Sequence, residues 1–247
     1  MSAVIPPKEL MALKDQGFIR SGATGLFTAH VIAVAGGLSA DETAALADAA
    51  RRFGDGRLIL TPRLTAEITG IPYENLPAFT DAIARAGLFT GGAGHGVRPV
   101  VCCKGSVCPR GLTDTFALAR ELHERFTLGY RGVRLPHKFN IAVGGCPNNC
   151  AKADLNDVGI VCFRGFRITL GGHWGRTGAA GVPMTAVFPR KEEVFPVVEK
   201  AILLYKDQGA PGERFYKLLE RLGMEQAEAL LLSDELLARK DEILSRP

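Results

Sequence analysis

Apolar and polar positions alternate, or recur at helical spacing, through most of this chain of 247 residues. The apolar run at residues 29–35 predicts a strand that ends at a pair of glycines. Ser39 and Glu42 have the spacing of a capping box, which predicts a helix directly after that strand. A second strand is expected at residues 57–61 and a second helix at 73–86. The first third of the chain therefore predicts the order strand–helix–strand–helix.

A glycine-rich segment at residues 90–96 predicts a boundary between two domains, residues 1–92 and 93–247. The first domain resembles a ferredoxin-like half-domain, in which helices cover one face of a sheet. The second is expected to be an α/β domain with a helical C-terminus, so the predicted fold class is α+β. Its expected strands are 97–102, 138–143, two short ones around Gly165 and 184–188, and its expected helices are 112–126, 194–207, 213–222 and 226–244.

Four cysteines stand in two pairs among glycines. Five residues separate Cys102 from Cys108, and three separate Cys146 from Cys150. Thiolates are soft ligands, and four of them from two loops suit an iron–sulfur cluster or zinc. Structural zinc usually has about two to four residues within each pair, and proline follows Cys108 and Cys146, as in ferredoxin-type cluster loops. The wide first gap therefore favours a cluster.

The two remaining cysteines leave alternatives open. Cys103 and Cys108 form a rival pair with four residues between them. Cys162 lies in an apolar run and reads as a buried core thiol. The first residues lack the basic start and apolar core of an export signal, so we expect a cytoplasmic protein whose thiols stay reduced. Disulfides are the less favoured interpretation.

Charge and hydropathy narrow the functional classes. The net charge is only +4, and the basic residues form no tract, which argues against a nucleic-acid binder. No apolar run approaches the ~20 residues of a membrane span. The hydrophobic content of 47% and the 29 glycines are typical of a loop-rich α/β protein.

Several segments carry a family resemblance. GGCPNNCAKADLNDVGIV resembles the signature of siroheme-dependent nitrite and sulfite reductases, and Cys102 with Cys108 is similar to the first cysteine pair of that family. RLILTPRLTAEITGI resembles a strand-plus-arginine segment of the same enzymes. The likeness runs over residues 27–178, and similarity to the small anaerobic or assimilatory-type sulfite reductases extends to PGERFYKLLERLG. It implies one siroheme coupled to a 4Fe-4S cluster.

The resemblance also implies the ligands. Cys102, Cys108, Cys146 and Cys150 would ligate the cluster, and Cys150 would bridge it to the siroheme iron. Some of the surplus basic residues near the glycine loops should face the carboxylates of siroheme. Lys104 is a candidate for such a contact.

The resemblance places cationic groups on the substrate side. Arg63, Arg98 and Lys138 match basic residues that bind an oxyanion and deliver protons. Asn140 stands where sulfite reductases usually have a second lysine and plant-type nitrite reductases often have asparagine. Arg176 is a further candidate to bind a siroheme carboxylate, because its planar guanidinium can donate two parallel hydrogen bonds to one carboxylate.

The implied activity is six-electron reduction of sulfite to sulfide, with reduction of nitrite to ammonia as the alternative. A protein that holds a cluster or a tetrapyrrole for electron transfer, without catalysis, is the other class that stays open. No nucleotide-binding glycine fingerprint is present, so a separate electron-donor protein is expected. Lys138 and Cys146 flank one strand that advances ~3.3 Å per residue, which separates them along the chain. This favours a homodimer with shared sites, and a monomer whose loop folds back is the alternative.

Overall fold

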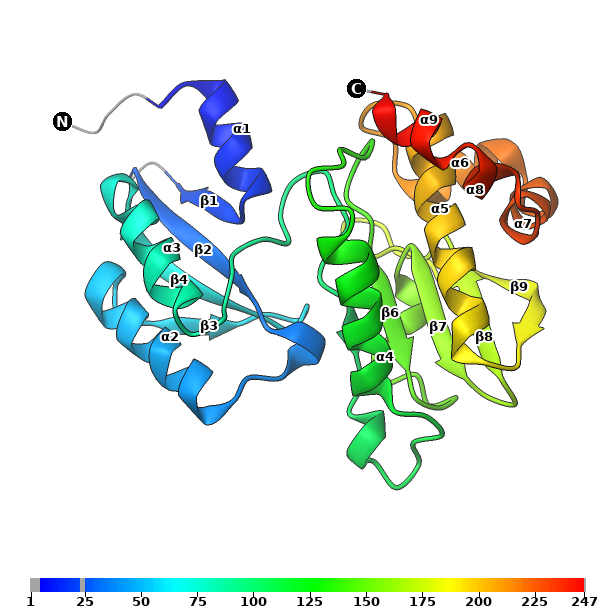
Figure 1. Ribbon diagram of the computed structural model, residues 1–247, viewed down its shortest axis with the longest axis horizontal. Coiled ribbons are helices and arrows are strands. Elements are labelled where there is room, and N and C mark those ends of the chain that lie inside the picture. Colours follow the sequence, from blue (N-terminus) through cyan, green and yellow to red (C-terminus); the bar gives the residue numbers. More distant parts are fainter. Residues whose placement is uncertain (1–4, 23–24, 247) are drawn as a thin grey trace. The chain divides into compact units, whose positions relative to one another are not determined.

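The computed structural model describes residues 5–22 and 25–246. The chain forms two compact units, an amino-terminal one that ends at Gly94 and a carboxy-terminal one that begins at His95 (Figure 1).

The described part of the amino-terminal unit contains one antiparallel sheet of four strands. Their order is β1 (Phe18–Ser21), β2 (Leu26–Ile32), β4 (Thr65–Pro72) and β3 (Leu58–Leu60). The helices are α1 (Pro7–Asp15), α2 (Ala40–Phe53) and α3 (Leu76–Ala84), with single 3-10 turns η1 (Val34–Gly36) and η2 (Tyr73–Asn75). Phe27, Ile68 and Phe79 are fully buried in the core between sheet and helices.

The capping box is confirmed. The Ser39 hydroxyl accepts a hydrogen bond from the Glu42 amide at 3.1 Å, and the Glu42 carboxylate accepts one from the Ser39 amide at 2.6 Å. The sequence interpretation missed β4, although its pattern was legible. Ala66 and Ile68 are buried while Glu67 between them is half-buried, which is the alternation of a strand with one face on the core.

The described residues of the carboxy-terminal unit contain a mixed sheet of five strands. The strands lie in chain order as β5 (Val101–Cys102), β6 (Ile141–Gly144), β7 (Val158–Cys162), β8 (Phe166–Leu170) and β9 (Val182–Phe188). Neighbours β5, β6 and β7 are parallel, and β7, β8 and β9 are antiparallel. The helices are α4 (Thr115–Leu122), π-helical η4 (His123–Leu128), α5 (Val194–Gln208), α6 (Phe215–Leu222), α7 (Met224–Leu232), α8 (Glu235–Ala238) and α9 (Lys240–Ser245), with short turns η3 (Gly105–Val107), η5 (Ala153–Leu155) and η6 (Lys191–Glu193).

Helices α4 and α5 lie over one face of this sheet (Figure 1). The side chains of Val143, Ile160 and Ile168 are paired across β6, β7 and β8 and are fully buried. Residues of the opposite face include Arg167, which is exposed. The sheet thus has a helix-covered face and an opposite face of different character.

The expected single helix at residues 226–244 is wrong. Helix α7 ends at Leu232, and the backbone turns away at Ser233, whose ψ is 169°. Two contacts stabilise this turn. Lys200 of α5, almost fully buried, donates from Nζ to the Ser233 carbonyl at 2.7 Å, and the Glu235 amide donates to Ser233 Oγ at 3.4 Å. A buried ammonium needs such an acceptor, so α7, α8 and α9 pack around α5 as separate short helices.

Candidate functional site

The two cysteine loops begin at the same edge of the sheet. Cys102 is the last residue of β5, and Cys146 follows the end of β6 by two residues. Since β5 and β6 are parallel neighbours, their carboxyl ends lie together. We call residues 102–112 and 145–150 the cysteine end of the carboxy-terminal unit.

The two loops are in contact. The Leu112 amide donates to the Gly145 carbonyl at 2.9 Å, and the Gly145 amide donates to Cys103 Sγ at 3.2 Å. A Cβ at Gly105 would lie 2.7 Å from the Thr115 side chain and 3.3 Å from the Gly145 Cα. Glycine at these positions is therefore what lets the loops lie side by side.

All six cysteines lie in the described residues and are thiols rather than disulfides. Cys102 is buried, and burial raises the pKa of its thiol to about 12. Cys108 and Cys146 are half-buried, and Cys150 is exposed.

Among the described residues, no three His, Cys, Asp or Glu side chains converge on a point where one metal ion would bind. A 4Fe-4S cluster is a larger group that takes each thiolate at a different iron. Two adjacent loops that present several thiols at a partly open edge therefore fit a cluster.

Basic residues gather at the opposite, amino edge of the same strands. Arg98 precedes β5, and its amide donates to the Phe139 carbonyl just before β6. The pKa of His137 is lowered to about 4, first by burial and then by the charges of Arg214, His95, Lys138 and Arg98. We call the group of Arg98, His137, Lys138, Arg214 and His95 the cationic end.

A buried carboxylate lies within the cationic end. Asp157, fully buried just before β7, accepts hydrogen bonds from the Asn140 amide at 2.8 Å and from Asn140 Nδ2 at 2.7 Å. Arg214 lies 3.4 Å from its other oxygen. Burial raises the pKa of Asp157, while Arg214 and Asn140 act in the opposite direction.

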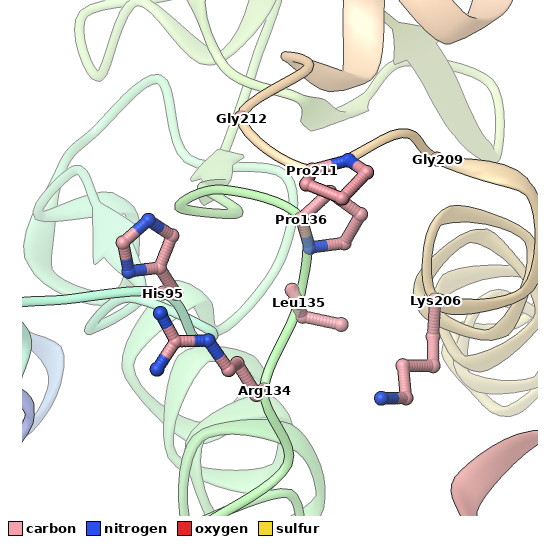
Figure 2. Close-up of a pocket in the computed structure, with 8 residues that line it drawn as sticks. All are labelled: His95, Arg134, Leu135, Pro136, Lys206, Gly209, Pro211 and Gly212. Atoms are coloured by element: carbon pink, nitrogen blue, oxygen red, sulfur yellow. The ribbon is translucent and has the colours of Figure 1, made fainter. Parts of the chain in front are cut away.

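A pocket adjoins the cationic end through His95, whose ring centre is 5.5 Å from that of His137. Its volume is about 240 Å³, and His95, Arg134 and Lys206 bring basic groups to its wall (Figure 2). Burial lowers the pKa of Lys206.

The predicted site residues other than the cysteines fall into three groups. Arg98 and Lys138 come together at the cationic end, where Asn140 is bonded to Asp157. The exposed candidates Lys104 and Arg176 lie in loops. Arg63 belongs to the amino-terminal unit, at the β3–β4 turn, where its amide donates to Thr61 Oγ1 at 3.2 Å.

Sequence reasoning missed Arg214 and His95. Arg214 lies in the segment PGERFYKLLERLG, which the family resemblance includes. It is inside the expected helix 213–222 and directly before the observed helix α6. Its role is visible only in three dimensions, because its partner Asp157 is 57 positions away in the chain.

Comparisons with known proteins bear on these observations. Residues 93–239 match the nitrite and sulphite reductase 4Fe-4S domain, and residues 20–86 match the nitrite/sulfite reductase ferredoxin-like half domain. The chain therefore belongs to the nitrite and sulfite reductase family, with a ferredoxin-like half-domain followed by the 4Fe-4S domain.

Three relatives show the range of the similarity. An uncharacterised protein of Methanocaldococcus jannaschii is 35% identical over 58% of this chain and 50% of its own length. The coenzyme F420-dependent sulfite reductase of the same organism is 32% identical, over 59% of this chain and 23% of its own. The ferredoxin–nitrite reductase of Leptolyngbya laminosa is 28% identical, over 92% of this chain and 49% of its own length.

The solved structure of the Mycobacterium tuberculosis NirA protein has the same fold, with a TM-score of 0.82 at 19% identity. That match covers 98% of this chain and 48% of NirA. The chain spans about half or less of the length of these named relatives. Within the described residues, no helix has the length and apolar character that crossing a membrane requires.

Proposed function

We propose that this chain is a siroheme- and 4Fe-4S-dependent reductase that converts sulfite to sulfide. The observation that carries the proposal is that one α/β unit has both adjacent cysteine loops and a separate group of cations. Electron transfer through a cluster needs the loops but no cationic group for an oxyanion. The similarity to named sulfite and nitrite reductases supports the same assignment.

The residues at the cysteine end would hold the cofactors. Cys108, Cys146, Cys150 and one of the two adjacent cysteines of the first loop would bind the cluster, with Cys150 also at the siroheme. Lys152 Nζ lies 5.5 Å above the Trp174 ring, which brings the loop of Arg176 close to the Cys150 segment. This supports Arg176 as a partner for a siroheme carboxylate, with Lys104 as a second.

The cationic end would serve the substrate. Reduction of sulfite to HS⁻ takes up six electrons and seven protons and releases three waters. When bound, the siroheme and the cluster supply the redox chemistry, with electrons from a separate electron-donor protein. Arg98 and Lys138 have the charge to bind the dianion and assist protonation as oxygen leaves. Arg63, in the amino-terminal unit, is assigned to the substrate side by the family resemblance alone.

Within one chain, the cysteine end and the cationic end lie at opposite ends of the same strands. Residues 139–144 are paired to neighbouring strands along their whole length, and such a segment spans ~17 Å. We therefore propose a two-fold homodimer in which the cationic end of one copy completes the site at the cysteine end of the other.

Nitrite is the second candidate substrate. The family resemblance supports it, because Asn140 stands where plant-type nitrite reductases often have asparagine. The third candidate is a cluster- or tetrapyrrole-binding protein without reductase activity.

Three measurements distinguish the three candidate functions: the visible absorption spectrum, the iron and sulfide content, and the rate at which each anion oxidises an artificial reductant. Siroheme bands toward the red together with faster oxidation by sulfite than by nitrite are the expected result. Faster oxidation by nitrite would support the second function. Cofactor without turnover of either anion would contradict the reductase assignment.

A further inference from the structure

The pocket beside the cationic end has no part in the proposed reduction. Its walls come from three stretches of the carboxy-terminal unit: His95, residues 134–136, and the end of α5 with the loop 209–212 that follows it (Figure 2). The Leu135 amide donates to the His95 carbonyl at 2.8 Å, and the Gly212 amide donates to the Pro136 carbonyl at 3.0 Å. Backbone hydrogen bonds therefore join all three walls.

The loop after α5 is built to stay in this position. The Gly209 amide donates to the Tyr205 carbonyl at 3.1 Å, and the Tyr205 hydroxyl donates to the Glu213 carbonyl beyond the loop. A Cβ at Gly209 would lie 2.6 Å from Pro136 Cγ, so glycine is what lets the loop approach residue 136 this closely. A pocket whose walls are fixed in this way is pre-formed, which lowers the entropic cost of binding a ligand.

The side chains that line the pocket give it a positive charge. His95, Arg134 and Lys206 are the titratable groups among the described lining residues, and none of those residues is acidic. In Figure 2, Lys206 lies on α5 at one side and His95 and Arg134 lie at the other, with the Lys206 ammonium directed toward them. Lys206 is half-buried, and an anion between the two sides would interact favourably with both.

The acidic residues next to the pocket in the sequence are engaged elsewhere. Asp207 pairs with Arg239 at 3.3 Å, and it also pairs with Arg246. The Glu213 carboxylate accepts hydrogen bonds from the Ala210 amide at 2.8 Å and from Arg221 at 3.0 Å. Neither carboxylate lines the pocket, so the positive character of its wall comes from the local arrangement.

The size and the apolar part of the wall narrow the ligand. The volume of about 240 Å³ equals that of roughly eight water molecules at about 30 Å³ each. A single tetrahedral oxyanion would leave much of this space empty. Leu135, Pro136 and Pro211 provide apolar surface beside the basic groups. The pocket therefore suits an anionic group carried on a short carbon skeleton.

We propose that this pocket binds a small organic dianion, either a phosphate monoester or a dicarboxylate, between Lys206 and the pair of Arg134 and His95. The arginine can hold a phosphate or a carboxylate with two parallel hydrogen bonds, and the lysine supplies a point charge from the other side. The site goes beyond the proposed function, because it requires neither cluster nor siroheme. It is also separate from the oxyanion site, with which it shares only His95.

The test is isothermal titration calorimetry of the purified protein with 3-phosphoglycerate and with succinate, and with glycerol as the uncharged control. We expect one of the two anions to bind, and the tighter one identifies the anionic group. Lys206→Met and Arg134→Gln should each weaken that binding roughly tenfold or more, the loss expected when a hydrogen bond to a charged group is removed. Lys217→Met, at an exposed lysine of α6 outside the pocket, is the matched control and should bind as wild type does.

A second comparison separates this pocket from the oxyanion site. Lys138→Ala should leave the affinity for the organic anion within about threefold of wild type, because charges outside the pocket are screened by salt. Circular dichroism melts establish that the variants are folded, and either pocket variant decides the question if the other does not fold. No binding of either anion at millimolar concentrations, unchanged affinity in a folded pocket variant, or an equal loss in Lys138→Ala would overturn the proposal. None of these results bears on sulfite or nitrite turnover.

Discussion

The cysteine end and the cationic end are opposite edges of the same three parallel strands, and they differ in what covers them. At the cysteine end, Val107 is 72% exposed and Leu112 is 58% exposed. At the cationic end, the charged groups are partly buried around Asp157, which is fully buried. One edge thus shows apolar side chains to solvent, while the other has its polar groups organised by internal contacts.

We propose that the cysteine end is the edge that a single chain leaves incomplete. Exposed apolar side chains beside thiols are expected where a cofactor or a partner will cover them. The cationic end is already built, with Asn140, Asp157 and Arg214 joined by hydrogen bonds. A second copy that brings its cationic end to the cysteine end would supply both the cover and the charge.

The largest expected effect is at the cysteine end. Cys150→Ser should abolish siroheme binding and remove at least part of the cluster, because it removes the proposed bridging thiolate. Cys162→Ser is the control, since Cys162 is buried at the end of β7 and its Sγ lies 3.8 Å from the Leu112 carbonyl. The visible spectrum and iron content check this. A complete haem spectrum in Cys150→Ser would contradict the ligand assignment.

A large effect on stability is expected at the cationic end. Arg214→Ala should lower the free energy of unfolding by roughly 3 kcal/mol, because it leaves Asp157 buried without its cation. Arg221→Ala is the control, in helix α6, which Arg214 directly precedes: the pair of Arg221 with Glu213 is half-exposed, so a much smaller loss is expected. Equal losses in urea titrations of the two variants would show that the buried pair has no special role.

The Arg214→Ala loss should depend on pH. Without Arg214, the pKa of Asp157, already raised by burial, rises further. A carboxyl whose pKa is higher in the folded state than in the unfolded state loses stability as the pH rises above its unfolded pKa. The difference between wild type and Arg214→Ala should therefore be larger at neutral than at acidic pH. A constant difference would contradict this cause.

A smaller effect is expected at Asn140. A lysine there would place its ammonium beside Asp157, which would neutralise it, so the ratio of sulfite to nitrite turnover should change by no more than about twofold, well under 1 kcal/mol. Kinetics of Asn140→Lys with both anions and an artificial reductant measure this. A many-fold rise in the ratio would show that position 140 faces the substrate.

The smallest expected effect is a change in the pKa of His137, which is about 4. Because this pKa lies below the ordinary value of 6.5, His137 contributes stability that is lost as the pH falls from about 6.5 toward 4. Lys138→Ala, or saturating sulfate as a non-reducible anion, should raise the pKa by removing or offsetting positive charge. NMR titration of His137 checks this, and an unchanged pKa in both cases would place Lys138 and the anion away from it.

The cysteine end was largely predictable from the sequence, because spacing, glycines and prolines are local features of two short segments. The cationic end was predictable only in part. Arg98 and Lys138 precede strands that the apolar pattern reveals, whereas Arg214 meets Asp157 from far along the chain. Similarly, the break between α7 and α8 depends on Lys200 of α5. No pattern within residues 226–244 records that contact.

The central claim, that two copies share each site, is tested most directly by mixing Cys150→Ser protein with Lys138→Ala protein. In a mixed dimer, one site has both faults and the other has neither. Random exchange of equal amounts should therefore restore about one quarter of the wild-type sulfite reductase activity. Native mass spectrometry establishes that subunits have exchanged. No recovery in a demonstrably exchanged mixture, or full activity of a wild-type monomer, would contradict the account.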